Sequence, residues 1–193
     1  MERTVRRLAA VLAADVVEYS GKIEADESST LAALKDLQAT TIDPLLAENS
    51  GRIVKTMGDG FIAEFSSVVD AVTFAVAMQK SGSERQQGTA PEKRLVYRIG
   101  INLGDVVVEG DDLLGDGVNV AARLEQICKP GGILISGTAF DQLQGKLGLP
   151  LDFTGEQQVK NINRSVRTYA VRLDGPLRAG VGRSPATSSA PVQ

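Results

Sequence analysis

The sequence lacks histidine and tryptophan entirely, and Cys128 is the only cysteine among its 193 residues. The absence of histidine excludes Ser-His-Asp hydrolysis, Cys-His catalysis and zinc sites built on imidazole. A single cysteine cannot form a disulfide within the chain, which favours a reducing compartment. Carboxylates, lysines, arginines and amides remain as the side chains available for chemistry.

The sequence also lacks a long apolar run. Residues 1–7 are basic, and the apolar stretch that follows them is interrupted by Asp15 and Glu18. A membrane-spanning helix needs about 20 predominantly apolar residues, and this stretch is also too short for the core of a signal peptide. We therefore predict a cytoplasmic protein with no membrane insertion by this chain.

No excess of positive charge is present either: 21 Lys and Arg residues face 24 Asp and Glu residues, for a formal net charge of −3. Proteins that grip DNA or RNA carry a basic patch or stripe, so we predict no nucleic-acid partner. A bound polyanion would need locally placed basic groups, with metal ions to offset the surrounding carboxylates.

The hydrophobic pattern predicts an α/β chain, an α+β sandwich with a largely antiparallel sheet flanked by helices. The apolar run 8–14 predicts a buried strand, and Ser28 and Ser29 predict the start of a helix that ends near Ala47. Two hairpins are expected, around 58–60 and around 103–104. The other expected elements are a helix opened by Ser67 and Asp70, a polar loop over 81–92, a helix over 117–128, a strand over 133–136, a short helix over 138–143, and late strands over 157–160 and 168–173.

Two acidic residues are the strongest candidates for a metal site. Asp15 ends an otherwise apolar strand, and Asp59 lies at the tip of the hairpin around 58–60. If the two strands are neighbours, both carboxylates meet at one end of the sheet, where a cation would relieve their repulsion. Mg²⁺ and Mn²⁺ prefer such hard oxygen ligands. Taken alone, Asp59 is better explained as an ordinary turn residue.

Four other polar residues are candidates for contacts to a nucleotide. Lys55 precedes Asp59 by four positions, about 13 Å along a strand, which suggests half-sites completed by a second subunit. Asn119 and Arg123 are spaced to share one face of a helix, where they could contact sugar and phosphate oxygens. Lys160 lies in an expected late strand. Each of these residues taken singly is also compatible with a solvated surface.

Five blocks of sequence, in order, resemble the class III adenylyl and guanylyl cyclases. The blocks cover residues 12–20, 53–60, 98–105, 115–123 and 159–162, within a stretch from about 8 to 173. The resemblance implies a ferredoxin-like nucleotide cyclase fold over residues 1–173, and we interpret 174–193 as a disordered tail or truncated linker. Five ordered blocks are far more specific than any one of them.

The resemblance also assigns a role to each candidate. Asp15 and Asp59 correspond to ligands of two divalent cations, Mg²⁺ or Mn²⁺. Lys55 and Asp112 correspond to the pair that reads adenine, whereas guanylyl cyclases typically carry Glu and a small polar or thiol residue there. The remaining assignments are Asn119 to orient the ribose, Arg123 to stabilise the transition state, Lys160 to bind phosphate, and the backbone of Val16, Val17, Glu18, Tyr19 and Ser20 to cradle the triphosphate.

These correspondences predict an adenylate cyclase that converts ATP to cyclic AMP and pyrophosphate. They imply a head-to-tail homodimer, with Asp15 and Asp59 from one subunit and the other side chains from its partner. Two alternatives remain open at this point. A diguanylate cyclase-like enzyme also carries a metal-binding hairpin, and a catalytically silent dimerisation module could keep the fold without the chemistry.

Overall fold

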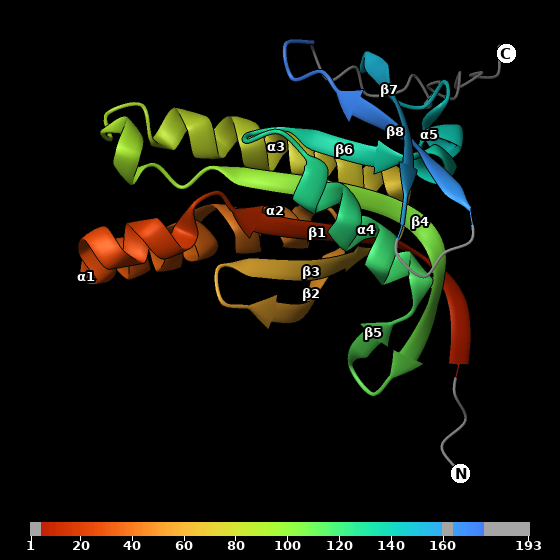
Figure 1. Ribbon diagram of the computed structural model, residues 1–193, viewed down its shortest axis with the longest axis horizontal. Coiled ribbons are helices and arrows are strands. Elements are labelled where there is room, and N and C mark those ends of the chain that lie inside the picture. Colours follow the sequence, from red (N-terminus) through yellow and green to blue (C-terminus); the bar gives the residue numbers. More distant parts are fainter. Residues whose placement is uncertain (1–4, 160–163, 176–193) are drawn as a thin grey trace, which may run out of the picture.

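The computed structural model describes residues 5–159 and 164–175 (Figure 1). The strands are β1 Val5–Val16, β2 Gly51–Met57, β3 Gly60–Phe65, β4 Tyr97–Glu109, β5 Asp112–Leu114, β6 Ile133–Ser136, β7 Leu151–Gln158 and β8 Ser165–Val171. The helices are α1 Tyr19–Leu37, the π-helix η1 Gln38–Ile42, α2 Asp43–Glu48, α3 Val68–Arg85, the 3-10 helix η2 Pro91–Lys93, α4 Asp116–Ile127 and α5 Gly137–Leu143.

The strands form one eight-stranded sheet in the order β2-β3-β1-β4-β6-β8-β7, with β5 paired to β4 outside this path. Within the described residues, the pairing of β4 with β6 is parallel and the other pairings are antiparallel. The predicted α/β sandwich with a mostly antiparallel sheet flanked by helices is therefore confirmed.

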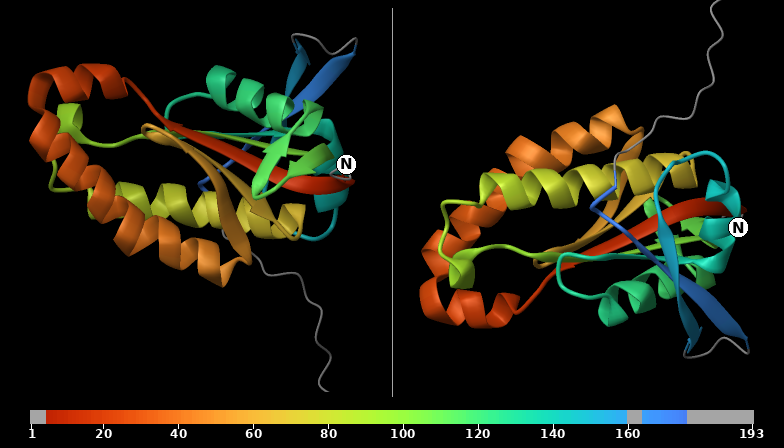
Figure 2. Two further views of the ribbon diagram at one scale, coloured as in Figure 1. Left: turned by 90° about the horizontal axis from the view of Figure 1, so that it is seen from below. Right: turned by 90° about the horizontal axis from the view of Figure 1, so that it is seen from above.

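Side chains of β1 alternate between two layers, because successive strand residues point to opposite faces. Leu12 and Ala14 belong to the larger core, which is closed by η1, α2, α3 and α5. Val11 and Ala13 lie on the other face, where they pack with Ala121 of α4. Figure 2 shows α4 alone on one side of the central strands and α2 and α3 on the other. This arrangement leaves α4 with an outer surface directed away from the sheet.

The first helix begins earlier than the sequence predicted. It starts at Tyr19, and Asp26 interrupts it with φ −160° and ψ 86°. The Asp26 carboxylate accepts a hydrogen bond from the Ser29 amide at 3.1 Å, so Asp26 caps the second stretch in place of Ser28 or Ser29. The helical run then continues through η1 and α2 to Glu48, close to the predicted end.

The predicted hairpin around Leu103 and Gly104 is wrong. β4 runs unbroken through both residues, because its residues 97–108 pair continuously with the 12-residue β1. Gly104 serves helix packing instead of a turn, since a Cβ there would lie 3.1 Å from the Cα of Gly117 in α4. The chain turns later, at Gly110, whose φ is 58°. A short strand, β5, follows this turn.

Two further boundaries differ from the prediction. α3 extends to Arg85, so the expected polar loop over 81–92 begins only after it. The late strands are β7 and β8, both of which start before the predicted 157–160 and 168–173 segments. Gly155, with φ 107°, lies at a shift of the β7–β8 register and does not end the strand. The predicted tail over 174–193 lies outside the described residues from 176 onward.

A buried carboxylate joins three neighbouring strands. Glu64 of β3 has an 8% exposed surface and forms ion pairs with Arg7 of β1 and Arg52 of β2, the latter at 2.9 Å. Burial by itself would raise the pKa of the Glu64 carboxyl, but the hydrogen bond and charge of Arg7 and the charge of Arg52 outweigh it and lower the pKa. The ionised pair therefore stabilises the sheet at neutral pH.

We expect Glu64→Gln to lower the free energy of unfolding by about 1–3 kcal/mol at pH 7. Because the pKa of Glu64 is lowered by folding, this stabilisation is present above the unfolded pKa and is lost as the pH falls through the folded value. Urea unfolding at pH 7 and pH 3, with the exposed Glu48→Gln as control, measures the effect. If Glu64→Gln lowers the free energy of unfolding equally at pH 7 and pH 3, the ion pairs of Glu64 with the two arginines contribute nothing to stability.

Candidate functional site

Asp15 and Asp59 lie side by side at one end of the sheet. Pairing of β1 with β3 brings Ala14 opposite Phe61, so the end of β1 adjoins the β2–β3 turn. The Asp59 Oδ2 accepts a hydrogen bond from the Val16 amide at 3.2 Å. A Cβ at Gly60, the first residue of β3, would lie 2.8 Å from the Ala14 carbonyl oxygen and 2.9 Å from the Asp15 Oδ1, and the clash with the backbone oxygen explains why this position holds glycine. The structure thus brings together two acids that are far apart in the sequence.

The proximity of the two carboxylates changes their protonation. Burial and the neighbouring Asp15 raise the pKa of the Asp59 carboxyl to about 6, although amide hydrogen bonds from its own backbone and from Val16 oppose the shift. Two such carboxylates repel each other unless a proton or a cation lies between them. The pair therefore has the electrostatic character of a cation site.

Arg98 is a residue of this site to which sequence reasoning assigned no role. It lies directly opposite Asp15 in the β1–β4 register, and its Nη2 is 3.5 Å from the Asp15 Oδ2. Its Nε is 3.4 Å from Glu125 of α4, whose pKa is raised to about 7 by burial and by Asp15 and Asp59, with Arg98 opposing. Only the strand register could have revealed this contact, because 83 positions separate Asp15 from Arg98.

The donors present suit a hard divalent cation whose coordination is completed by a ligand. Within the described part of the chain, no cluster of three or more acidic, cysteine or histidine side chains has metal-binding geometry. Asp15 and Asp59 supply only carboxylate oxygens, which Mg²⁺ and Mn²⁺ prefer, and they leave coordination positions open. A cation held by two carboxylates would be free to bind phosphate oxygens as well.

Lys55 and Asp112 meet at a second position on the α4 face of the sheet. The Lys55 Nζ lies 3.7 Å from the Asp112 Oδ2, and the two side chains are 51% and 38% exposed. A bulge between Ile53 and Lys55 places Lys55 opposite Ile62 and so on the α4 face. The earlier placement of Lys55 and Asp59 on one strand is wrong, because β2 ends at Met57.

This second position is separate from the acidic pair. Two strand spacings and a two-residue offset put Lys55 about 12 Å from Asp15 along the sheet. No ion pair or hydrogen bond among the described residues links Lys55 or Asp112 to Asp15 or Asp59. One chain therefore holds two incomplete groups of polar side chains.

Asn119 and Arg123 occupy the outer surface of α4. Both are exposed and stand one turn apart, whereas Val120, Ala121 and Leu124 of the same helix are buried against the sheet. Gly100 of β4 makes this packing close, since a Cβ there would lie 2.3 Å from the Ala121 carbonyl oxygen. The two polar side chains lie on the face of α4 away from their own sheet, and in the part of the chain that the structure describes no hydrogen bond or ion pair joins them to Asp15 or Asp59.

The loop after Asp15 is partly committed to internal hydrogen bonds. The amide of Val16 donates to Asp59, and that of Val17 donates to the Val96 carbonyl at 2.8 Å. Glu18 caps α1 in the left-handed conformation, with φ 55° and ψ 32°, and Tyr19 and Ser20 open the helix. The amides of a first helical turn have no partner within the helix. Lys160 lies outside the described residues.

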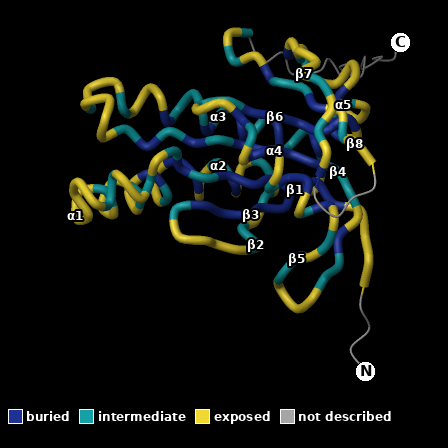
Figure 3. Tube along the Cα trace, in the orientation of Figure 1, coloured by how far each residue is buried: buried dark blue, intermediate teal, exposed yellow. Residues whose placement is uncertain are grey.

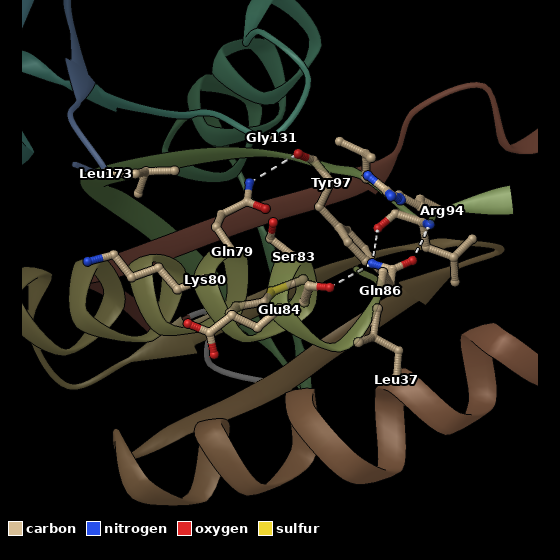
Figure 4. Close-up of a pocket in the computed structure, with 14 residues that line it drawn as sticks. Leu37, Gln79, Lys80, Ser83, Glu84, Gln86, Arg94, Tyr97, Gly131 and Leu173 are labelled. Atoms are coloured by element: carbon tan, nitrogen blue, oxygen red, sulfur yellow. Dashed lines mark hydrogen bonds between the residues drawn. The ribbon is translucent and has the colours of Figure 1, made fainter. Parts of the chain in front are cut away.

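A separate cavity of about 410 Å³ lies between α3 and the start of β4 (Figure 4). The Gln86 amide group bonds to the main chain of Gly82 and Leu95, and Gln79 donates to the carbonyls of Tyr97 and Gly132. None of the candidate residues lines it. Its polar side chains hold the start of β4 against α3, and they add nothing to the acidic pair.

The family model for the adenylate and guanylate cyclase catalytic domain matches residues 5–172. The chain belongs to this family. A Rhizobium meliloti relative named "Putative adenylate cyclase 3" is 42% identical over 164 residues, which is 85% of this chain and 28% of that protein. An adenylate cyclase of Streptomyces coelicolor is 32% identical over 139 residues, 72% of this chain and 35% of its own length. The chain thus spans about a third of these relatives.

A solved cyclase structure has the same fold. The adenylate/guanylate cyclase/hydrolase from Silicibacter pomeroyi is 41% identical, with a TM-score of 0.82 over 88% of this chain and 98% of that one. The adenylyl cyclase CyaB from P. aeruginosa has a TM-score of 0.76 at 25% identity, and the guanylyl cyclase Cya2 has 0.74 at 22%. Cyclases of both kinds share the fold, so the fold leaves the choice between ATP and GTP to the side chains.

No helix in the described part of the cyclase domain has the length and hydrophobicity needed to cross a bilayer.

Proposed function

We propose that this cyclase domain acts on ATP and forms 3′,5′-cyclic AMP and pyrophosphate. The pairing of Lys55 with Asp112 at 3.7 Å carries the proposal. Adenine presents an acceptor at N1 and donors at its 6-amino group, and these match a lysine ammonium and a carboxylate. Guanine reverses both positions, with a donor at N1 and an acceptor at O6. A Lys–Asp pair therefore favours adenine over guanine.

The acidic pair suits the triphosphate end of the substrate. Two divalent cations, Mg²⁺ or Mn²⁺, bound by Asp15 and Asp59 would lower the pKa of the ribose 3′-hydroxyl and offset the phosphate charge. The 3′-oxygen forms a bond to the α-phosphorus while the bond from that phosphorus to the pyrophosphate oxygen breaks. The hydroxyl proton passes to water or to a substrate phosphate, because the chain has no histidine to act as a base.

The other candidate side chains act on the sugar and on the developing charge. Asn119 orients the ribose, and Arg123 stabilises the charge that builds on the α-phosphate in the transition state. Lys160 and the amides at the start of α1 bind the leaving pyrophosphate, as the resemblance implies. Arg98 forms an ion pair with Asp15 and so adds a positive charge beside the acidic pair.

We further propose that each active site is shared by two copies of the chain. Asp15 and Asp59 would come from one protomer, and Lys55, Asp112, Asn119 and Arg123 from its partner. Two features support this proposal. No hydrogen bond or ion pair joins the two groups within residues 5–159 and 164–175, and the polar side chains on α4 lie on its exposed face, away from their own sheet. A symmetric head-to-tail dimer would build two equivalent sites.

Product analysis tests the proposed reaction. The purified chain, incubated with Mn²⁺ or Mg²⁺ and either ATP or GTP, should release cyclic AMP from ATP and should turn over GTP much more slowly. Formation of cyclic diguanylate from GTP would identify a diguanylate cyclase-like enzyme. Absence of any cyclic product with either nucleotide and either metal would favour a silent dimerisation module.

A further inference from the structure

Glu18 has an unusual backbone for its residue type. Its φ of 55° is in the left-handed region, and the other non-glycine residue described with positive φ is Ser50. A side chain in this conformation costs roughly 1–2 kcal/mol relative to glycine, because Cβ comes too close to the following carbonyl oxygen. The chain makes a sharp bend here, between the end of β1 and the first residue of α1. Glycine would fit this bend better, so the presence of glutamate needs a reason other than backbone fit.

The surroundings of Glu18 are already acidic. It follows Asp15 by three residues, and a second acid, Asp59, accepts a hydrogen bond from the Val16 amide two residues before it. Arg98 is shared between Asp15 and Glu125, and Lys22 bonds to the Glu92 carbonyl at 2.7 Å. Within residues 5–159 and 164–175, Glu18 has no ion-pair partner. Its carboxylate therefore adds a charge that no neighbouring cation neutralises.

Glu18 does not serve as a third metal ligand in this structure. The described side chains contain no cluster of three acids with metal-binding geometry, so its carboxylate stands apart from the Asp15–Asp59 pair. It also makes no hydrogen bond that would cap α1. Neither a metal cluster nor a side-chain cap hydrogen bond therefore accounts for an acid at this position.

The position of Glu18 bears directly on the triphosphate. Two of the five amides proposed to cradle it, those of Val16 and Val17, are already bonded within the chain. The amides that remain are those of Glu18 itself, Tyr19 and Ser20. The exposed carboxylate of Glu18 would therefore be close to phosphate oxygens bound by the amides of Tyr19 and Ser20.

We propose that Glu18 opposes binding of the substrate triphosphate and so weakens the affinity of the site for ATP. The inference rests on the proposed function, because it assumes that the loop after Asp15 receives a polyphosphate. The glutamate acts as an internal anion that competes with the ligand. In water-exposed surroundings such repulsion is screened by salt, so its effect should be largest at low ionic strength.

Glu18→Gln tests the charge while keeping a side chain of the same size. We expect the KM for ATP to fall by roughly 3- to 10-fold at low salt, with kcat changed less than about twofold. Glu48→Gln, an exposed acid on α2, gives the same change in net charge and should leave both constants as they are. An unchanged or higher KM in Glu18→Gln would overturn the proposal.

Binding of inorganic tripolyphosphate in the presence of Mn²⁺ gives a readout that does not need turnover. Isothermal titration should show about 3- to 10-fold tighter binding to Glu18→Gln than to the wild type, and the difference should shrink in 0.5 M KCl. Equal affinities would refute the inference while leaving cyclic AMP formation intact. Tighter binding without any cyclic product would instead refute the proposed function and keep the inference.

Thermal unfolding of two further Glu18 variants tests the strain at the bend. Glu18→Gly should raise Tm by about 2–4 °C, since it removes both Cβ and the charge, whereas Glu18→Ala keeps the crowded Cβ and should not. If Glu18→Gly and Glu18→Ala have the same Tm, the backbone at this bend does not disfavour a side chain, and the inferred strain at Glu18 is wrong.

Discussion

Replacing Arg123 with alanine should lower kcat for cyclic AMP formation by about 10²- to 10³-fold, the usual loss when one donor to a developing charge is removed. The side chain lies exposed on the outer surface of α4 and forms no ion pair or side-chain hydrogen bond with the residues that the structure describes. We therefore expect the free energy of unfolding to change by less than about 0.5 kcal/mol. Steady-state kinetics with ATP, together with thermal unfolding, measure the two effects.

Arg85→Ala is the matched control for this prediction. Arg85 ends α3 and hydrogen bonds to Thr40, on the opposite side of the sheet from α4. It should retain turnover close to that of the wild type. Near-normal turnover in Arg123→Ala would instead show that Arg123 has no role in the transition state.

Asp59→Asn should reduce cyclic AMP formation by at least about 10³-fold, because it removes one of only two carboxylates proposed to hold the cations. The same change should not harm the metal-free fold. Burial and Asp15 raise the pKa of Asp59, so its ionised form is unfavourable in the folded state at pH 8, and asparagine removes that cost. After allowance for solvent screening, we expect the free energy of unfolding of the metal-free protein to rise by on the order of 1 kcal/mol.

Metal binding separates this explanation from simple loss of structure. Addition of Mn²⁺ should raise the Tm of the wild type, since a ligand that binds only the folded state stabilises it. The same addition should leave Asp59→Asn almost unchanged. An equal Mn²⁺-induced shift in both proteins would place the cations away from Asp59.

Much of the site was predictable from sequence because its residues lie at places that local pattern marks. Asp15 ends an apolar run, and Asp59 occupies an Asp-Gly turn, so a strand pairing between them was enough to predict their meeting. The positions of Asn119 and Arg123 followed in the same way from helical spacing. The positions of these four residues could be predicted because each depends on a short segment of sequence around it.

The features that were missed depend on contacts between distant segments. Arg98 joins the acidic pair only through the register of β1 with β4. The resemblance implied the pairing of Lys55 with Asp112, but not the bulge in β2 that places Lys55 on the α4 face. The turn predicted at Gly104 was wrong for a similar reason: this glycine allows α4 to pack closely on β4, and the chain does not reverse there. The strain at Glu18 comes from its positive φ, and a glutamate in the sequence does not indicate such a backbone conformation.

The most direct test of the shared active site is to mix two inactive variants. Asp59→Asn lacks the acidic pair, and Arg123→Ala lacks the α4 contact, so each homodimer should be nearly inactive. If protomers exchange freely at equal amounts, half the dimers are mixed and each has one intact site, giving about a quarter of wild-type activity. Recovery near this level is what a site built from both protomers predicts. No recovery, in mixtures shown to exchange subunits, would mean that the site is not divided between protomers in this way.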